Sequence, residues 1–290
     1  MTTTVDESPV FSLDAQLDEM LNVPDVVFIV PYRNREQHKT FFTRYMTDYI
    51  LKDVKYKWQI VFVHQCDVRA FNRGAMKNLG FKYLKDKYPK YYKNITIVFN
   101  DVDTLPYKEG LIDYTVAHGN VKHFYGYNFA LGGIFSIKAG DFEIINGFPN
   151  LWGWGFEDNE IQNRWVDEYG KNTIDRTSFY NINDHNILSF FNGNQKMVSH
   201  KQKEEYGDTF VLNRNKKKNV RFLNGLNTLF NAVYEEEQLA KGIAMVKVIA
   251  FDTTNDDKKY SFQVQNLETS SFKYVPKRGS KIKMVSNTRR

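Results

Sequence analysis

The residues best suited to chemistry lie in the stretch FEIINGFPNLWGWGFEDNEIQNRW, from Phe142 to Trp165. It contains the loop Trp152-Gly153-Trp154-Gly155, and three carboxylates follow at Glu157, Asp158 and Glu160. Glycine adopts backbone conformations closed to other residues and lets a ligand approach closely. Apolar rings beside paired carboxylates, where a helix begins, are typical of a sugar site that contains a base.

A structural explanation of the same stretch is also open. Acidic residues in the first turn of a helix often only complement its dipole. A tryptophan-rich loop can equally well fill a core. The stretch alone therefore does not decide between a site and a structural plug.

A second carboxylate pair, Asp101-Val102-Asp103, follows the apolar run Ile95–Phe99. Side chains alternate along extended chain, so both carboxylates can face a ligand while Val102 turns away. Hard oxygen ligands suit Mg²⁺ or Mn²⁺ bridging two phosphates. An isolated D-x-D is also common in turns, where its role is structural.

Basic side chains follow two earlier apolar runs. Arg33 and Arg35 come after Val26–Val30, and Phe71-Asn72-Arg73 comes after the run 59–63. Arginine forks can hold a diphosphate, and a nucleotide base can stack on Phe71. The alternatives are a surface salt-bridge pair and a helix start with a packed phenylalanine.

The elements that must position these residues form a strand-helix series. The three apolar runs read as buried strands, with helices over 36–51 and from 71 to 84, which predicts an α/β protein with an open, mostly parallel sheet. Ligands of such sheets sit beyond the carboxyl ends of the strands. Further along, the pattern predicts a strand over 134–137, a helix over 225–234, and strands over 245–251, 260–264 and 272–275.

Composition narrows the class of protein. A chain of 290 residues with 42% hydrophobic residues can hold one large α/β domain with appendages. The net charge of +6 lies largely in Lys216–Lys218 and Lys273–Arg290, which we interpret as solvated segments rather than a specific nucleic-acid site. The single Cys66 excludes an internal disulfide and fits a reducing compartment. With no leader pattern and no apolar run near the ~20 residues that span a bilayer, we expect a soluble, cytoplasmic protein.

Taken together, the motifs resemble the β-1,4-galactosyltransferase family of inverting, Mn²⁺-dependent transferases. The resemblance spans Val26 to Tyr234, in the segments IVPYRNREQH, FNRGAMKNLGF, NDVDTLP, LGGIFSI, INGFPNLWGWGFEDNEIQNR, MVSH and NGLNTL. It implies a GT-A type, Rossmann-like sheet flanked by helices, and the small C-terminal β extension that we expect lies past the resemblance. The expected division is a lead-in over 1–24, a catalytic domain over 25–244 with a mobile lid at 201–219, and an extension with a basic tail over 245–290.

The resemblance also assigns roles residue by residue. Asp158 would be the general base that deprotonates the acceptor hydroxyl, and Mn²⁺, with Mg²⁺ as the alternative, would be the cofactor. UDP would be bound by Arg33, Arg35, Phe71, Arg73, Asp101 and Val102, and the metal by Asp103, Met197 and His200. The donor sugar would meet Glu157, Asp158, Gly133, Trp154, Arg73 and Ala130. The glycan acceptor would meet Tyr127, Trp154, Asn159 and Phe210.

Departures from the family pattern concern specificity and location. Ala130 stands where galactose-specific members carry tyrosine, which opens space near the C2 substituent of the donor, so UDP-Gal and UDP-GalNAc both stay open. Phe156, Asn159 and Thr209-Phe210 also differ, which indicates an acceptor other than the usual GlcNAc, or one held differently. A membrane anchor and paired cysteines are absent from the sequence, which favours work on cytoplasmic or virus-associated glycans.

Two other functions compete with a transferase. A non-catalytic sugar or nucleotide binder on the same fold would have no need of a base or a metal, yet the candidates Asp158, Asp103, Met197 and His200 are all present. A metal nuclease would use the carboxylates and the basic tail. It would give no reason for the Trp-Gly loop or for Phe71.

We expect the small Ala130 to let the protein accept an N-acetylated donor as well as UDP-Gal. The measurement is turnover across a panel of UDP-sugars with a common set of glycan acceptors. Turnover of UDP-Gal with complete rejection of UDP-GalNAc would contradict the role given to Ala130.

Overall fold

The computed structural model describes residues 21–153, 155–190, 196–199, 224–254 and 262–265, and the structural statements below concern these residues. The elements that build the central sheet and its helices are β1 (Val26–Tyr32), α2 (Glu36–Tyr45), β2 (Trp58–Gln65), α3 (Arg73–Lys87), β3 (Thr96–Asn100), β5 (Val121–Gly126), β6 (Ile134–Lys138), α4 (Ala139–Ile144), α5 (Glu157–Tyr169), β7 (Ile174–Asp175), β8 (Tyr180–Asn181), β11 (Leu229–Ala240) and β12 (Ile243–Thr253). Shorter elements are η1 (Met46–Ile50), η2 (Tyr92–Asn94), β4 (Thr104–Pro106), η3 (Lys171–Thr173), β9 (Ile187–Ser189), β10 (Lys196–Ser199), η5 (Leu226–Thr228) and β13 (Phe262–Gln265).

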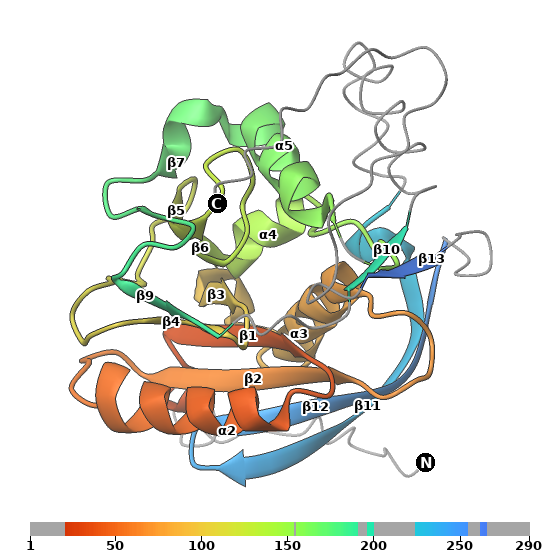
Figure 1. The fold of residues 1–290 in the computed structure, drawn as a ribbon, viewed down its shortest axis with the longest axis horizontal. Coiled ribbons are helices and arrows are strands. Elements are labelled where there is room, and N and C mark those ends of the chain that lie inside the picture. Colours follow the sequence, from red (N-terminus) through yellow and green to blue (C-terminus); the bar gives the residue numbers. More distant parts are fainter. Residues whose placement is uncertain (1–20, 154, 191–195, 200–223, 255–261, 266–290) are drawn as a thin grey trace, which may run out of the picture.

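One large open sheet organises the described part of the chain (Figure 1). Its order is β11-β12-β2-β1-β3-β6-β5-β7, and β8 also pairs with β5. The strands β12, β2, β1 and β3 run parallel, whereas β6 is antiparallel to β3 and β11 is antiparallel to β12. This arrangement confirms the predicted α/β class with a mostly parallel open sheet.

Helices cover both faces of the sheet. Successive side chains of its central strands point to opposite faces, and both sets are apolar. Val27 and Ile29 of β1 belong to one core cluster, which includes residues of α3, α4 and α5. Val26 and Phe28 belong to the other, which includes residues of α2 and η1. All seven residues of β1 are buried. A continuous apolar run therefore marked a central parallel strand, as expected.

Helix α3 begins at Arg73, two residues after the predicted start at 71. The side chain of Asn72 accepts a hydrogen bond from the backbone N–H of Ala75 at 2.9 Å and so caps the helix. The backbone N–H of Asn72 donates to Oε1 of Gln65 at the end of β2, at 2.8 Å. The helix start is therefore tied to the strand that precedes it, which fixes the position of Arg73.

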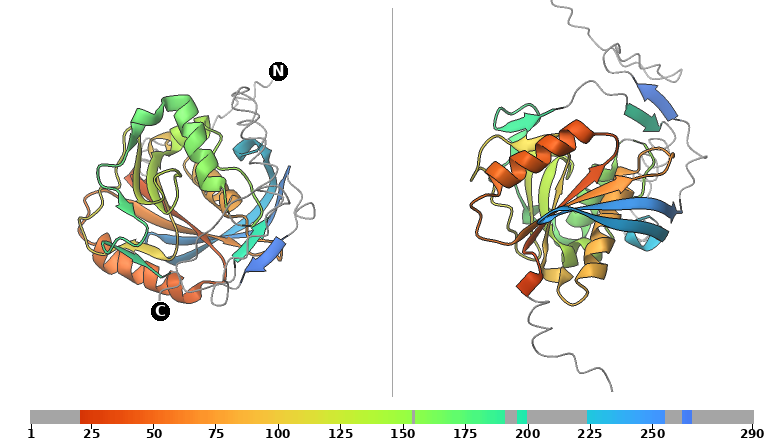
Figure 2. Two further views of the ribbon diagram at one scale, coloured as in Figure 1. Left: turned by 45° about the horizontal axis from the view of Figure 1, so that its top comes forward. Right: turned by 90° about the horizontal axis from the view of Figure 1, so that it is seen from below.

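Two features of the C-terminal part differ from the sequence expectations. The predicted helix over 225–234 is wrong: a single 3-10 turn, η5, leads directly into β11. Pairing with β12 overrides the apolar spacing that suggested a helix, and the long hairpin is visible along one side of the sheet in Figure 2. Strand β12 straddles residue 244, the expected domain boundary, and pairs with β2 inside the central sheet.

The other C-terminal expectations have mixed outcomes. The predicted strand over 245–251 lies within β12, and the strand over 260–264 corresponds to β13, which pairs with β10. The expected strand over 272–275, the lid at 201–219 and most of the lead-in lie outside the described residues. Among the described helices, none combines the length and the apolar character needed to cross a bilayer.

We expect Gly74→Ala to destabilise the fold, because a Cβ at this position would lie 2.1 Å from the carbonyl oxygen of Pro149. Overpacking of this kind costs about 1–3 kcal/mol, and here the obstacle is backbone. The free energy of unfolding, measured by chemical denaturation, tests this. Lys85→Ala, on the same helix at a more exposed position, is the control. Equal stability of Gly74→Ala and the wild type would show that the contact is not tight.

Candidate active site

The candidate site lies beyond the carboxyl ends of β1, β2 and β3. Strand β1 has β2 on one side and β3 on the other, so the connection from β1 runs to one side and the connection from β2 crosses back to the other. Crevices of α/β sheets form at such switch points. There, Nη1 of Arg35, which follows β1, contacts Oδ2 of Asp103, which follows β3, at 3.1 Å. Two segments singled out from sequence alone therefore meet at the expected place.

The guanidinium of Arg73 is the centre of the site. Its Nη2 lies 2.7 and 2.8 Å from the two carboxylate oxygens of Asp101. Its Nη1 lies 2.7 Å from Oε1 of Glu157 and 2.8 Å from both oxygens of Asp158. One side chain at the start of α3 thus joins the end of β3 to the first turn of α5. The sequence-predicted residues Arg73, Asp101, Glu157 and Asp158 form one cluster.

A residue that sequence reasoning missed also belongs to this cluster. Lys77 stands one helical turn after Arg73, with only 1% of its side chain exposed, and its Nζ lies 3.2 Å from Oδ1 of Asp158. The same ammonium lies 4.3 Å from the ring centroid of Phe148. The available signal was the spacing of four residues, one helical turn, from Arg73.

The charges of the cluster set its protonation. Burial alone raises the pKa of Asp158, but the adjacent Arg73 and Lys77 outweigh burial and hold that pKa below its usual range. Burial likewise opposes the charge of Arg73, yet Asp101, Asp158 and Glu157 raise its pKa. Asp158 is therefore an ionised carboxylate at neutral pH, and Arg73 is a permanent cation.

A glycine turn forms the wall behind Asp158. A Cβ at Gly132 would lie 2.5 Å from Oδ2 of Asp158, and the backbone N–H of Leu131 donates to the carbonyl of Asp158 at 2.9 Å. Gly133 has φ +66, and a Cβ there would lie 2.4 Å from the carbonyl oxygen of Tyr125. Only glycine fits at these two positions without moving the turn.

Buried His123 supports the turn from beneath. Its Nε2 lies 3.0 Å from the carbonyl oxygens of both Tyr125 and Gly132. Nε of Arg176 donates to its Nδ1 at 3.0 Å, so we infer that the proton of the neutral ring is on Nε2. Burial, with the charge of Arg176, lowers the pKa of His123 to about 4. Arg176 also donates to Gln162 of α5 at 2.6 Å, which links the turn to the helix that carries Asp158.

The tryptophan loop divides into a structural part and a part near the site. Trp152 is 1% exposed and stacks on Phe251 of β12, with ring centroids 5.4 Å apart. The guanidinium of Arg69 lies 4.6 Å from the ring centroid of Trp152. Gly153 forms a bridge to Asn72, beside Arg73. Trp152 is therefore the core plug that the structural explanation allowed, whereas Trp154 lies outside the described residues.

The backbone that follows the loop is strained where the helix begins. Phe156 has φ +70 and is the N-cap residue of α5. A bulky residue with positive φ is unusual, and such strain clusters at functional sites. Its ring is 40% exposed. The conformation turns the chain so that Glu157 and Asp158 enter the first turn of α5 facing Arg73.

The other three residues assigned to UDP, Arg33, Phe71 and Val102, also contact or pack against the protein. The two terminal nitrogens of Arg33 donate to the backbone carbonyls of Arg69 and Asp67, so Arg33 holds the loop that leads to Phe71. The half-buried Phe71 packs against the core, and its carbonyl accepts a hydrogen bond from Gly153 at 3.1 Å. Val102 is 7% exposed.

Exposed aromatic rings stand next to the catalytic candidate, on the loop between β5 and β6. Tyr127 and Phe129 stack with centroids 5.2 Å apart and are 55% and 60% exposed. Nδ2 of Asn159 lies 3.5 Å from the carbonyl oxygen of Phe129. Ala130, in contrast, is 5% exposed. Phe129 was not among the predicted residues, although its place between Tyr127 and the Gly132-Gly133 turn was a signal.

The predicted metal ligands are described only in part. Asp103 keeps 16% of its side chain exposed, while the backbone of Met197 lies in β10, opposite Val264 of β13. His200, like the acceptor candidate Phe210, lies outside the described residues. Within the described ranges, no three His, Cys, Asp or Glu side chains gather closely enough to hold a metal ion.

The available donor set nevertheless fits a divalent cation. Burial and the neighbouring charge of Asp101 raise the pKa of Asp103. A bound cation would relieve this repulsion between carboxylates, and carboxylate oxygen is a preferred ligand of Mg²⁺ and Mn²⁺. Asp103 is therefore suited to the role assigned to it.

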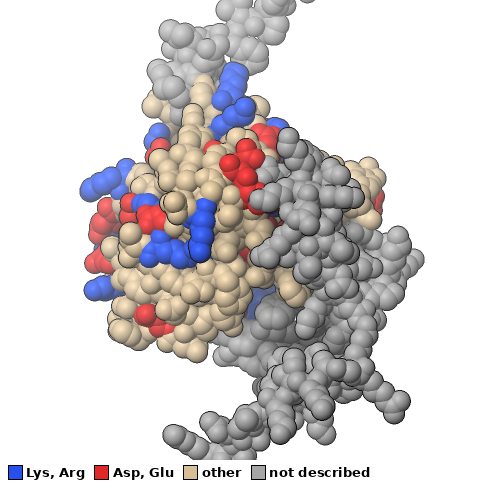
Figure 3. Space-filling view, turned by 90° about the horizontal axis from the view of Figure 1, so that it is seen from above, with Lys and Arg blue, Asp and Glu red and all other residues tan. Residues whose placement is uncertain are grey.

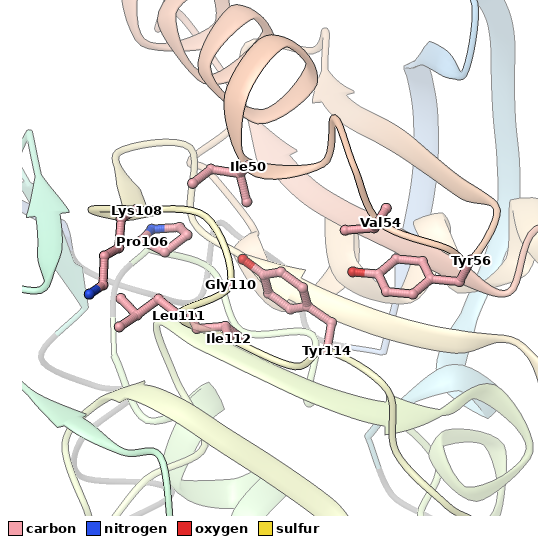
Figure 4. Close-up of a pocket in the computed structure, with 9 residues that line it drawn as sticks. All are labelled: Ile50, Val54, Tyr56, Pro106, Lys108, Gly110, Leu111, Ile112 and Tyr114. Carbon is pink, nitrogen blue, oxygen red and sulfur yellow. The ribbon is translucent and has the colours of Figure 1, made fainter.

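A separate pocket is lined by none of the candidate site residues (Figure 4). It lies between η1 and the loop that follows β4. Its wall includes Tyr56 and Tyr114, and the buried hydroxyl of Tyr114 has no hydrogen-bond partner among the described residues. The lining is otherwise mostly apolar, and it carries no carboxylate. The charged cluster, not this pocket, is the candidate active site.

The open sheet, with a charged cluster at the carboxyl edge of its parallel strands, is a glycosyltransferase fold of the GT-A class. The similar solved structures include Drosophila β-1,4-galactosyltransferase 7, as a mutant in complex with manganese, UDP-Gal and xylobiose, with a TM-score of 0.57 and 20% identity. That match covers 82% of this chain and 97% of the other. Residues 18–115 match the model of the N-terminal region of glycosyl transferase group 7, and residues 114–187 match that of the N-terminal domain of galactosyltransferase. The chain belongs to this family, the β-1,4-galactosyltransferases.

Individual relatives agree with this assignment. The chain is 34% identical to β-1,4-galactosyltransferase 1 of Bos taurus over 149 residues, which is 48% of this chain and 36% of the bovine protein. It is 31% identical to β-1,4-galactosyltransferase 7 of Drosophila melanogaster over 153 residues, which is 50% of this chain and 45% of that protein. The matched region thus spans less than half the length of each of these relatives.

We expect Arg73→Met to lower the free energy of unfolding by about 3 kcal/mol, because it removes the cation that Asp101, Glu157 and Asp158 share and leaves Lys77 beside Asp158. This value is the lower end of the range for removing one partner of a buried ion pair. We choose it because the side chains of Asp101 and Asp158 are 28% and 24% exposed, so water partly screens their charges. The deficit should shrink as the pH falls. In the wild type, the lowered pKa of Asp158 gives stability that is lost as the pH falls through it, and in the variant protonation relieves the repulsion.

Chemical denaturation across pH measures both effects. Arg44→Met, which removes an exposed arginine of α2, is the matched control. A deficit that is as large at acidic pH as at neutral pH would contradict the electrostatic explanation.

Proposed function

We propose that the chain is an inverting, metal-dependent glycosyltransferase that moves Gal or GalNAc from a UDP-sugar to a hydroxyl of a glycan. One observation carries the proposal. Arg73 gathers Asp101, Glu157 and Asp158 at the carboxyl edge of the parallel strands, at 2.7–2.8 Å. This arrangement gives a charged donor site and an ionised base within one cluster.

The donor would lie over the switch point of the sheet. Arg35 and Arg73 are the cations that a diphosphate would meet there. Arg33 holds the loop that carries Phe71, and the half-exposed side of that ring is available for stacking with uracil. In support, the related Drosophila enzyme was solved with UDP-Gal. The buried, small Ala130 keeps UDP-GalNAc open as an alternative donor.

Asp103, with Met197 and His200, would hold a manganese ion. When bound, such an ion would stabilise the negative charge that develops on the departing UDP. Arg35, whose nearest carboxylate is Asp103 at 3.1 Å, would stabilise the same charge from the side of β1. Manganese is also bound in the complex of the Drosophila relative.

Asp158 would act on the acceptor. The acceptor hydroxyl transfers its proton to the carboxylate of Asp158 while its oxygen attacks the anomeric carbon of the donor. The bond from that carbon to the phosphate oxygen breaks, and its electron pair leaves with UDP. Because attack comes from the face opposite UDP, the configuration inverts. The stacked rings of Tyr127 and Phe129, beside Asn159, are suited to contact the apolar face of an acceptor sugar.

The remaining assignments complete the proposal. Residues 201–219 would form the lid that excludes water over the bound donor. Acidic and basic side chains are interspersed on the face shown in Figure 3, which gives no support to a nucleic-acid footprint there. A chain with one free cysteine, Cys66, suits a cytoplasmic or virus-associated setting.

We expect Asp158→Asn to lose at least about 10²-fold in turnover, the lower bound of typical general-base contributions, while still binding UDP. The assay is UDP release with Mn²⁺, a UDP-sugar and a panel of glycan acceptors, combined with calorimetry of UDP binding. Asp167→Asn, which changes an exposed carboxylate of the same helix, is the matched control.

Near-normal turnover in folded Asp158→Asn would refute its role as base. A wild-type protein that binds UDP but transfers no sugar would instead favour a non-catalytic nucleotide or sugar binder.

A further inference from the structure

Lys77 is a buried cation that the proposed reaction leaves without a role. It lies in α3, one turn after Arg73, with 1% of its side chain exposed. Lysine is among the residues least often buried, because removing its ammonium from water is costly. Its Nζ lies 3.2 Å from Oδ1 of Asp158, so the carboxylate that would act as base compensates for that cost.

The surroundings of Lys77 keep its ammonium directed at Asp158. Nζ lies 4.3 Å from the ring centroid of Phe148 and 5.8 Å from that of Phe99. These rings stabilise a cation through their faces and fill the space into which the side chain would otherwise swing. The position is therefore built to hold a charge, and not only to fill volume.

The two oxygens of Asp158 are not equivalent. Oδ1 accepts from Nη1 of Arg73 at 2.8 Å and from Nζ of Lys77 at 3.2 Å. Among the residues that the structure describes, Arg73 is the one donor to Oδ2, also at 2.8 Å. A carboxylate oxygen has two lone-pair directions. Oδ1 is thus saturated by cationic donors, and Oδ2 keeps the capacity to accept one more proton.

Arg73 and Lys77 also differ in the groups that they bind. Arg73 shares its N–H groups among Asp101, Glu157 and Asp158, and it is a proposed partner of the donor. A diphosphate that draws on Arg73 weakens its hold on Asp158. Lys77 pairs with Asp158 and is not a proposed partner of the donor. It can therefore hold the carboxylate in place throughout the reaction.

We propose that Lys77 is a positioning residue for the base: it fixes Oδ1 of Asp158, so that Oδ2 is the oxygen that takes the proton of the acceptor. The inference rests on the proposed function of Asp158. Burial and the charge of Arg73 lower the pKa of Lys77, whereas Asp158 raises it. The role proposed for Lys77 requires contact with neither substrate. The direction of the Asp158 pKa agrees, since the two cations lower it against the effect of burial.

The test compares Lys77→Met with Lys85→Met, a lysine of the same helix that instead pairs with Glu143. For Lys77→Met we expect turnover to fall by at least about tenfold, within the roughly 10²-fold that a misplaced catalytic group costs. The dissociation constant of UDP should stay within about twofold, because the nucleotide does not reach Lys77. Lys85→Met should match the wild type in both.

A second readout follows the carboxylate directly. The pKa of Asp158, measured by NMR of carbon-13-labelled aspartate and assigned by the signal missing in Asp158→Asn, should rise in Lys77→Met, since one of two neighbouring cations is gone. The acidic limb of the pH profile of kcat/KM should move to higher pH with it. The other titratable groups around Asp158, namely Arg73, Glu157, Asp101 and the neutral, buried His123, are unchanged in this comparison. Lys77→Gln, which keeps a donor but removes the charge, provides a second variant if Lys77→Met does not fold.

An unmoved Asp158 pKa, or turnover within twofold of the wild type in a folded Lys77 variant, would overturn the inference. Failure of the proposed function gives a different result. In that case the wild-type protein itself transfers no sugar, whereas failure of this inference alone leaves an active wild type and an equally active Lys77 variant.

Discussion

The site depends on the ion pairs of one guanidinium. Arg73 holds carboxylates that arrive from two directions, Asp101 from the end of β3 and Glu157 with Asp158 from the start of α5. Without a cation between them, three like charges so close together would repel each other and shift their pKa values upward. The position of Arg73 is fixed in turn by the cap of α3 on Asn72 and by the tie from Asn72 to Gln65 of β2. The chemistry of the cluster is therefore set by how one helix is anchored to the sheet.

The same helix is held against the rest of the protein by close backbone contacts. Gly74 packs directly on the carbonyl of Pro149, and Asn78 hydrogen-bonds with both the N–H and the carbonyl of Phe148. The segment before the tryptophan loop is thus fixed to α3. Beyond it, Trp152 stacks on Phe251 of β12, so the last long strand of the sheet supports the loop that leads to the proposed base. These contacts hold the segments around the site against the sheet.

Sequence reasoning recovered much of this arrangement. The buried strands, the helix that follows Phe71 and the start of α5 at Glu157 follow from local signals: apolar runs, helical spacing and glycines that break one element before the next. The gathering of Arg35, Arg73, Asp101 and Asp103 at one edge also followed, because parallel strands bring their carboxyl ends to one edge. The predicted helix over 225–234 failed because its apolar spacing is local, whereas its strand pairing with β12 is not.

By itself, the sequence determined which side chains would stand at the edge of the sheet, since strand order and polarity place the residues that follow each strand. Only the tertiary structure decided which of them touch. It showed that Trp152 is a core residue, although the sequence of its loop is typical of a sugar site. It also placed Lys77 inside the charge cluster rather than on a solvated helix face. The physical reason is that a lysine or a tryptophan takes its role from its neighbours in space. Those neighbours come from segments up to about a hundred residues away, as Trp152 and Phe251 do, and no local pattern records them.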